Sequence, residues 1–104
     1  MQRVAFKMKL FKGCGEEYLR RHNEIWLELK ELLKRSGIAE YSIFLDRETN
    51  ILFAYLTIEN SEELEKLPHA PVMKKWWEHM KDIMETNEDN SPVSSPLVEV
   101  FNLE

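Results

Sequence analysis

Cysteine, histidine and glycine are scarce in this chain of 104 residues, which contains one cysteine, three histidines and three glycines. The single cysteine, Cys14, cannot form an internal disulfide and has no second cysteine with which to bind zinc. Neither an HxxH nor a CxxC motif occurs, so metal binding has no support. A disulfide framework is therefore excluded, and a reducing, cytoplasmic compartment is the simplest localisation.

Long apolar runs and large blocks of one charge are also missing. No apolar stretch reaches the roughly 20 residues that a membrane-spanning helix needs, and charges interrupt residues 1–7, which do not resemble a signal peptide. The net charge of −5 is spread over acidic and basic residues that alternate along the chain. We therefore expect a protein that binds neither membranes nor nucleic acids.

The motifs of nucleotide-binding proteins and serine hydrolases, G-x-G-x-x-G, the P-loop and G-x-S-x-G, do not occur. What is present is typical of a globular protein, with 43% apolar and 32% charged residues. The length suffices for one domain with a modest core, which we expect to span residues 1–104. The chemistry open to its side chains is proton transfer without a cofactor.

The spacing of apolar residues predicts an alternation of strands and helices. Their order is strand, helix, strand, strand, helix, strand, which is typical of an α+β, ferredoxin-like fold with an antiparallel sheet. Asn60 is expected to cap the second helix, and a Pro-bounded interruption divides it. The predicted strands cover residues 3–11, 39–46, 51–58 and 97–103, the first helix covers residues 16–36, and the second covers residues 60–84 with its interruption at 68–71.

The predicted strand over residues 51–58 is apolar on both of its faces, which indicates burial on both sides. Helices can cover one face of the sheet. The other face would need a second sheet, and a chain this short has few strands left to build one. The sequence therefore favours a homodimer of the dimeric α+β barrel type, in which a partner subunit covers the second face.

His22 is the leading candidate for chemistry. It lies one helical turn after Tyr18 on the apolar face of the first predicted helix. A neutral imidazole can give or take a proton near pH 7, and a phenol one turn away could orient a ligand hydroxyl. The alternative is structural: a histidine bonded to backbone at the edge of the core, next to a tyrosine that holds its hydroxyl at the rim.

Three further aromatic residues, Tyr41, Trp76 and Trp77, are candidates for ligand contact. Neighbouring helix positions point roughly 100° apart, so one tryptophan can enter the core while the other faces a cleft. Aromatic faces stack on the C–H faces of sugars, but they also fill cores and interfaces. Both interpretations stay open for all three residues. His69 lies in the Pro-bounded interruption and His79 lies off the apolar face of its helix, and we expect both to be solvated.

Six segments, taken together and in this order, resemble the L-rhamnose mutarotase family. They are YLRRHNEIW at 18–26, Tyr41 with LD at 45–46, LFA at 52–54, WWEHM at 76–80, DNSPVSS at 89–95 and EVF at 99–101. The resemblance therefore runs almost from end to end of the chain. Leu27, where a proline is expected, and the unusual Gly13-Cys14-Gly15 are the departures from the family pattern, and both lie away from the matched site residues.

The resemblance implies a cytoplasmic isomerase that interconverts the α and β anomers of L-rhamnose, built as a dimer of ferredoxin-like units. It implies that His22 is the proton donor and that Tyr18, Tyr41, Trp76 and Trp77 bind the sugar. His22 as imidazolium could protonate the ring oxygen, with water or a carboxylate such as Asp89 as the second proton carrier. No cofactor or metal is implied.

Two other functions are compatible with the same fold, because fold alone does not settle function. One is a non-catalytic module that binds sugars or other proteins. The other is a cofactor-free monooxygenase, since similar dimeric barrels can host one. Catalysed exchange of sugar anomers would separate the mutarotase from both.

Overall fold

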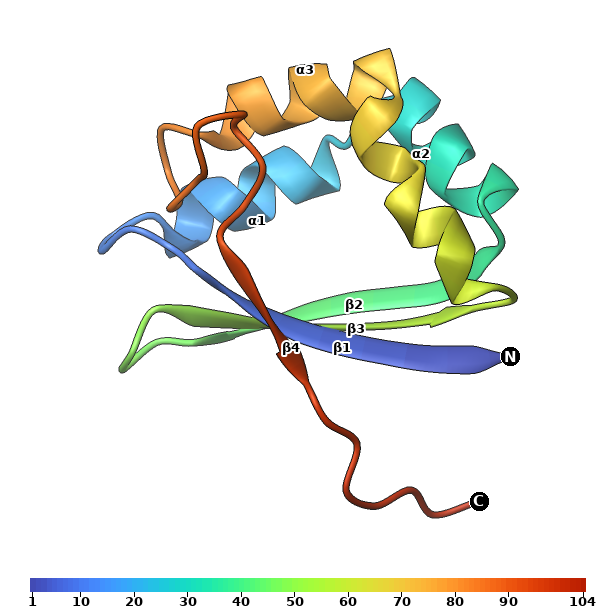
Figure 1. The fold of residues 1–104 in the computed structure, drawn as a ribbon. Helices are drawn as coiled ribbons and strands as arrows, with labels where there is room; N and C mark the ends of the chain where they lie inside the picture. Colours follow the sequence, from blue (N-terminus) through green and yellow to red (C-terminus); the bar gives the residue numbers. More distant parts are fainter.

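A four-stranded antiparallel sheet in the order β2-β3-β1-β4 forms one layer of the molecule. The computed structural model, which describes all 104 residues, places every helix on one face of this sheet (Figure 1). This arrangement confirms the predicted α+β, ferredoxin-like fold. The strands are β1 (Gln2–Lys9), β2 (Ile38–Asp46), β3 (Ile51–Ile58) and β4 (Ser94–Leu97), and the helices are α1 (Gly15–Asn23), α2 (Leu27–Arg35), the 3-10 helices η1 (Ser61–Glu65) and η2 (Leu67–His69), and α3 (Pro71–Met80). No helix is both long and apolar enough to span a membrane.

The core lies between the sheet and the helices. Strand β3 contributes Leu52, Ala54, Leu56 and Ile58, which face the helices and are almost fully buried. The opposite face of the sheet is not covered by any helix of the chain (Figure 1). It carries Phe44 on β2 and Phe53 on β3, which pair across the two strands and are 67% and 38% exposed. The sheet is therefore apolar on both sides but covered on one.

The single helix predicted over residues 16–36 is wrong, because the chain forms two helices with a bend between them. Trp26 has an extended backbone (φ −63°, ψ 137°) and precedes the first turn of α2, while the Ile25 N–H closes α1 on the His22 carbonyl at 3.2 Å. On a straight helix, adjacent side chains diverge by about 100°. The bend lets Ile25 and Trp26 both pack against the core.

Leu27, the residue where the family pattern suggested proline, occupies the first position of α2 and is 70% exposed. The N–H of a first helical residue has no partner within its helix, and the extended backbone of Trp26 suits a following proline. Leu27→Pro is therefore expected to raise the free energy of unfolding in urea by about 0.4–1 kcal/mol. Glu28→Pro is the matched control and should destabilise, because Leu27 is helical. Destabilisation by Leu27→Pro would contradict this description of the bend.

The elements near residue 60 and residue 80 differ modestly from those predicted. Asn60 caps a 3-10 helix rather than an α-helix, accepting a hydrogen bond from the Glu62 N–H at 3.0 Å. Helix α3 ends at Met80, four residues before the predicted Met84, yet Met84 stays buried because it pairs with Leu10 at the end of the sheet. The apolar spacing therefore identified the buried side chains correctly beyond the point where the helix stops.

The last predicted strand is displaced, since β4 covers Ser94–Leu97 and residues 98–104 form no regular structure. Strand β4 lies at the edge of the sheet, where Pro96 is tolerated because the outer side needs no ladder donor. The apolar residues that suggested a strand over 97–103 lie in an exposed tail instead. These are Val98, Val100, Phe101 and Leu103, each at least 76% exposed.

Candidate active site

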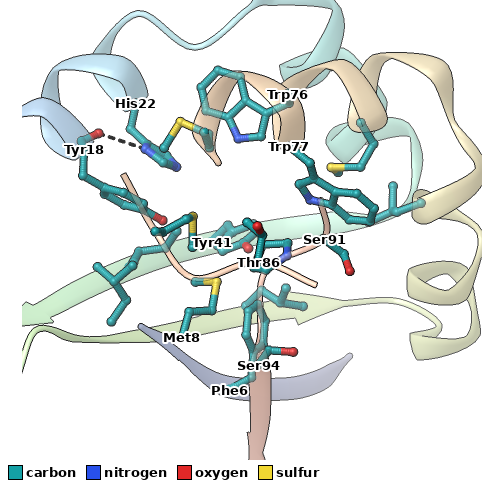
Figure 2. A pocket seen from close by; sticks show the side chains of 18 of the residues that line it. Phe6, Met8, Tyr18, His22, Tyr41, Trp76, Trp77, Thr86, Ser91 and Ser94 are labelled. Carbon is teal, nitrogen blue, oxygen red and sulfur yellow. Dashed lines mark hydrogen bonds between the residues drawn. The ribbon is translucent and has the colours of Figure 1, made fainter. Parts of the chain in front are cut away.

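A cavity of about 990 Å³ opens between the helices and the sheet. Its walls carry aromatic, methionine and aliphatic side chains together with a small polar segment from residues 86–94. The structure brings all five predicted site residues to this one cavity (Figure 2). They come from three elements, with Tyr18 and His22 on α1, Tyr41 on β2, and Trp76 and Trp77 on α3.

The His22 ring is fixed by three contacts with two residues, Tyr18 and Trp76. Its Nδ1 lies 3.0 Å from the Tyr18 carbonyl oxygen, its face stacks on the Tyr18 ring at 4.2 Å between centroids, and Trp76 meets it edge-on at 5.4 Å. A carbonyl only accepts hydrogen bonds, so Nδ1 carries the hydrogen in the neutral ring. The other nitrogen, Nε2, has no protein partner and remains available to a ligand in the cavity.

The surroundings favour the neutral forms of three of the titratable side chains that line the cavity, which also include Arg47. Burial lowers the pKa of His22, and the hydrogen bond to the Tyr18 carbonyl offsets this effect in part. Burial also raises the pKa of Tyr41 to about 12 and that of Tyr18 well above its usual value. At neutral pH the cavity therefore offers an imidazole with a free lone pair and two phenols that can donate hydrogen bonds.

Arg21 holds α1 against the end of α3, next to the site. Its guanidinium forms a bidentate ion pair with Asp82 at 2.8 and 3.1 Å, donates to the His79 carbonyl at 2.6 Å and contacts Glu17 at 2.7 Å. The Arg21 side chain is 11% exposed. Because α1 carries His22 and α3 carries the tryptophans, this clamp fixes the imidazole relative to the aromatic wall.

The two tryptophans take the different positions that their spacing predicted. Trp76 is 7% exposed and packs edge-on against Trp26 at 5.1 Å. Trp77 is half-buried and lines the cavity from the margin of α3. Trp76 is therefore part of both the core and the cavity wall, while Trp77 serves the cavity more than the core. His69 and His79 are exposed, as expected.

The polar part of the cavity wall was not predictable from the sequence pattern. Residues 85–96, between the predicted second helix and the last predicted strand, are polar and typical of a loop, and residues 89–95 carry part of the family resemblance. Asp89, considered there as a second proton carrier, is exposed and is not among the residues that line the cavity. Its neighbours in the loop do reach the cavity: Thr86, Asn87, Asn90, Ser91 and Ser94.

Comparison with known proteins identifies the family of this chain. The family model for L-rhamnose mutarotase matches residues 3–103. A protein of that name from Clostridium beijerinckii is 55% identical over 103 residues, which is 99% of each chain. The chain belongs to the L-rhamnose mutarotase family. The resemblance that the six sequence segments carry is thereby confirmed.

Solved structures place this mutarotase family member in the same fold. The crystal structure of an L-rhamnose mutarotase from Formosa agariphila matches all of both chains with a TM-score of 0.94 and 52% identity. A dimeric ferredoxin-like protein from an uncultured marine organism matches 97% of this chain and 96% of its own with a TM-score of 0.58. At 16% identity, that second likeness concerns the fold alone.

Proposed function

We propose that residues 1–104 form one mutarotase domain, which interconverts the α and β anomers of L-rhamnose and uses His22 as its proton carrier. Family membership supports the reaction. The observation that supports the role of His22 is its geometry, with Nδ1 fixed by a carbonyl and Nε2 open to the cavity. Tyr18, Tyr41, Trp76 and Trp77 are the proposed sugar contacts.

The reaction passes through the open-chain aldehyde. Neutral His22 accepts the proton of the anomeric hydroxyl at Nε2, the bond between the anomeric carbon and the ring oxygen breaks, and its electron pair stays on the ring oxygen. The imidazolium then gives its proton to that oxygen, which is bonded to the same carbon in the ring form. Rotation of the aldehyde and the reverse steps close the ring to the other anomer. The protons balance without a cofactor.

The other proposed contacts suit the polar and the apolar groups of a sugar. The phenols of Tyr18 and Tyr41 stay protonated, because burial raises the pKa of both, so each can donate a hydrogen bond to a sugar oxygen. Trp76 and Trp77 offer aromatic surface to C–H groups, including the methyl group of a 6-deoxy sugar. Such contacts would orient the anomeric carbon toward His22.

The pH dependence of the catalysed rate tests which form of His22 acts first. Because protonated Nε2 has no lone pair, the rate should rise with pH through the lowered pKa of His22 and become level once the ring is neutral. Anomer exchange is measured between about pH 4.5 and 8.5, with the spontaneous rate subtracted at each point. A rate that falls with rising pH would instead assign the first step to the imidazolium.

We also propose that the protein is a homodimer, formed through the open face of the sheet. The exposed apolar residues Phe44 and Phe53 on that face, and Phe101 in the tail, support this assembly. Sedimentation at micromolar concentration should show a dimer, and Phe44→Glu should shift it to monomer while the circular dichroism spectrum is retained. A wild-type protein that sediments as a monomer of 12.4 kDa would contradict the proposal.

Polarimetry tests the proposed activity itself. Freshly dissolved α-L-rhamnose changes its optical rotation as the anomers equilibrate, and the protein should speed this change in proportion to its concentration. Sugar binding without acceleration would favour the non-catalytic module. Acceleration that requires neither metal nor cofactor is the expected result.

A further inference from the structure

The polar wall of the cavity is a closed turn. Thr86 and Pro92 form a bridge, the Asn87 N–H donates to the Ser91 carbonyl at 2.7 Å, and the Asn90 N–H donates to the Asn87 carbonyl at 2.9 Å. In Figure 2, Thr86 and Ser91 lie on the opposite side of the cavity from His22 and Trp76. A ligand that reaches His22 at one side can therefore be contacted by this turn at the other.

The hydrogen bonds of the Ser91 hydroxyl are mostly occupied within the protein. The Ser91 Oγ donates its hydrogen to the Asp89 carboxylate and accepts from the Asn87 Nδ2 at 3.0 Å. Asp89 is held in place by a second bond, from the Ser91 N–H at 3.0 Å. A serine hydroxyl has one hydrogen and two lone pairs. Ser91 is therefore left with one free lone pair and no hydrogen to donate.

Thr86 differs from Ser91 in this respect. Its hydroxyl has no hydrogen bond within the protein, although it also lines the cavity. A free hydroxyl can rotate to donate or to accept, so Thr86 tolerates either kind of ligand group. Ser91, in contrast, can contact a ligand well only where the ligand presents a hydrogen-bond donor.

We propose that Ser91 is a specificity-determining contact of the site, which accepts one hydrogen bond from a hydroxyl on the sugar ring. Asp89 is the positioning residue behind it: the carboxylate fixes the direction of the serine hydroxyl and draws its hydrogen away from the cavity. This inference rests on the proposed function, since it assigns a sugar to the cavity. A sugar that lacks the matching hydroxyl, or carries it on the other ring face, leaves the Ser91 lone pair unpaired.

The experiment compares L-rhamnose with its 2-, 3- and 4-deoxy derivatives by the quenching of tryptophan fluorescence. Wild-type protein should bind one of the three deoxy sugars about 10-fold more weakly than L-rhamnose, the loss expected for one unpaired acceptor. The Ser91→Ala variant should bind L-rhamnose about 10-fold more weakly than the wild type does. Its affinity for that deoxy sugar should equal that of the wild type. The ratio of the dissociation constants of the two sugars should thus fall to about one in this variant.

Three further variants distinguish a hydrogen bond between Ser91 and the sugar from a structural role of Ser91 in the turn. Ser91→Cys keeps the shape but accepts hydrogen bonds weakly, so it should lose discrimination as Ser91→Ala does. Asp89→Asn keeps an acceptor for the Ser91 hydroxyl but removes the charge, and should reduce discrimination by about 2–3-fold, less than the loss of the contact. Glu88→Gln, in the same turn but outside the cavity lining, is the matched control and should keep the wild-type discrimination.

The outcomes separate this inference from the proposed function. A wild-type protein that does not speed anomer exchange of L-rhamnose would contradict the function. The role of Ser91 is contradicted when the wild type does speed exchange, yet Ser91→Ala and Ser91→Cys discriminate among the deoxy sugars as the wild type does. An equal loss of affinity for all four sugars in both variants would also contradict it, since that pattern indicates a structural role.

Discussion

His22→Asn is expected to lower the catalysed rate of anomer exchange by a factor of about 10²–10⁴, the usual contribution of one positioned proton carrier. The fold should persist, because an asparagine amide can still donate to the Tyr18 carbonyl that the His22 Nδ1 now contacts at 3.0 Å. Sugar binding should persist as well, since the phenols and the tryptophans are untouched. Saturation-transfer rates, divided by the folded fraction from a thermal melt, give the result.

His79→Asn is the matched control for this variant. His79 also lies near Trp76, at 5.6 Å between ring centroids, but it is exposed and does not line the cavity. Its replacement should leave exchange unchanged. A His22→Asn protein with a lower melting temperature and an undiminished rate per folded molecule would make His22 structural, and would move the proton transfer to another group in the cavity.

Trp76→Ala should mainly lower stability, whereas Trp77→Ala should mainly weaken sugar binding. Trp76 is buried among Trp26, His22 and the core, so its truncation should cost about 3–5 kcal/mol of unfolding free energy. Trp77 is half-buried and lines the cavity, so its truncation should weaken L-rhamnose binding more than it lowers the melting temperature.

Thermal melts and sugar titrations on both variants measure this difference. The comparison is internally controlled, because the two variants delete the same side chain at adjacent positions of one helix. Should Trp77→Ala melt far earlier than Trp76→Ala, the assignment of the two faces of α3 would be reversed.

The strands near the centre of the chain were the most predictable part of the fold. Strand β3 has the predicted bounds, Ile51–Ile58, and β2 begins one residue early, at Ile38. Their alternation is local, and the short polar link between them allows one pairing. The bend at Trp26 was not predictable in this way, because the apolar residues around it also fit the stripe of a straight helix. The bend depends on how the helices pack against the sheet, and this tertiary packing is not encoded in the local spacing of apolar residues.

The candidate site shows the same division between local and tertiary information. Helical spacing placed Tyr18 and His22 on one face and separated Trp76 from Trp77, and the structure agrees with both. From pattern alone Tyr41 fitted either ligand contact or core packing, and its role as a sugar contact was implied by family resemblance. The Ser91 contact could not be predicted, since its character depends on hydrogen bonds to Asp89 and Asn87 within a turn.

Saturation-transfer NMR between the two anomeric proton signals of L-rhamnose tests the central claim most directly, because it measures exchange at equilibrium without a coupled reaction. With wild-type protein, saturation of one anomeric signal should reduce the other, in proportion to protein concentration and well beyond the spontaneous exchange in buffer. Equal transfer with and without protein, under conditions where the sugar is bound, would contradict the proposal that this cavity catalyses mutarotation.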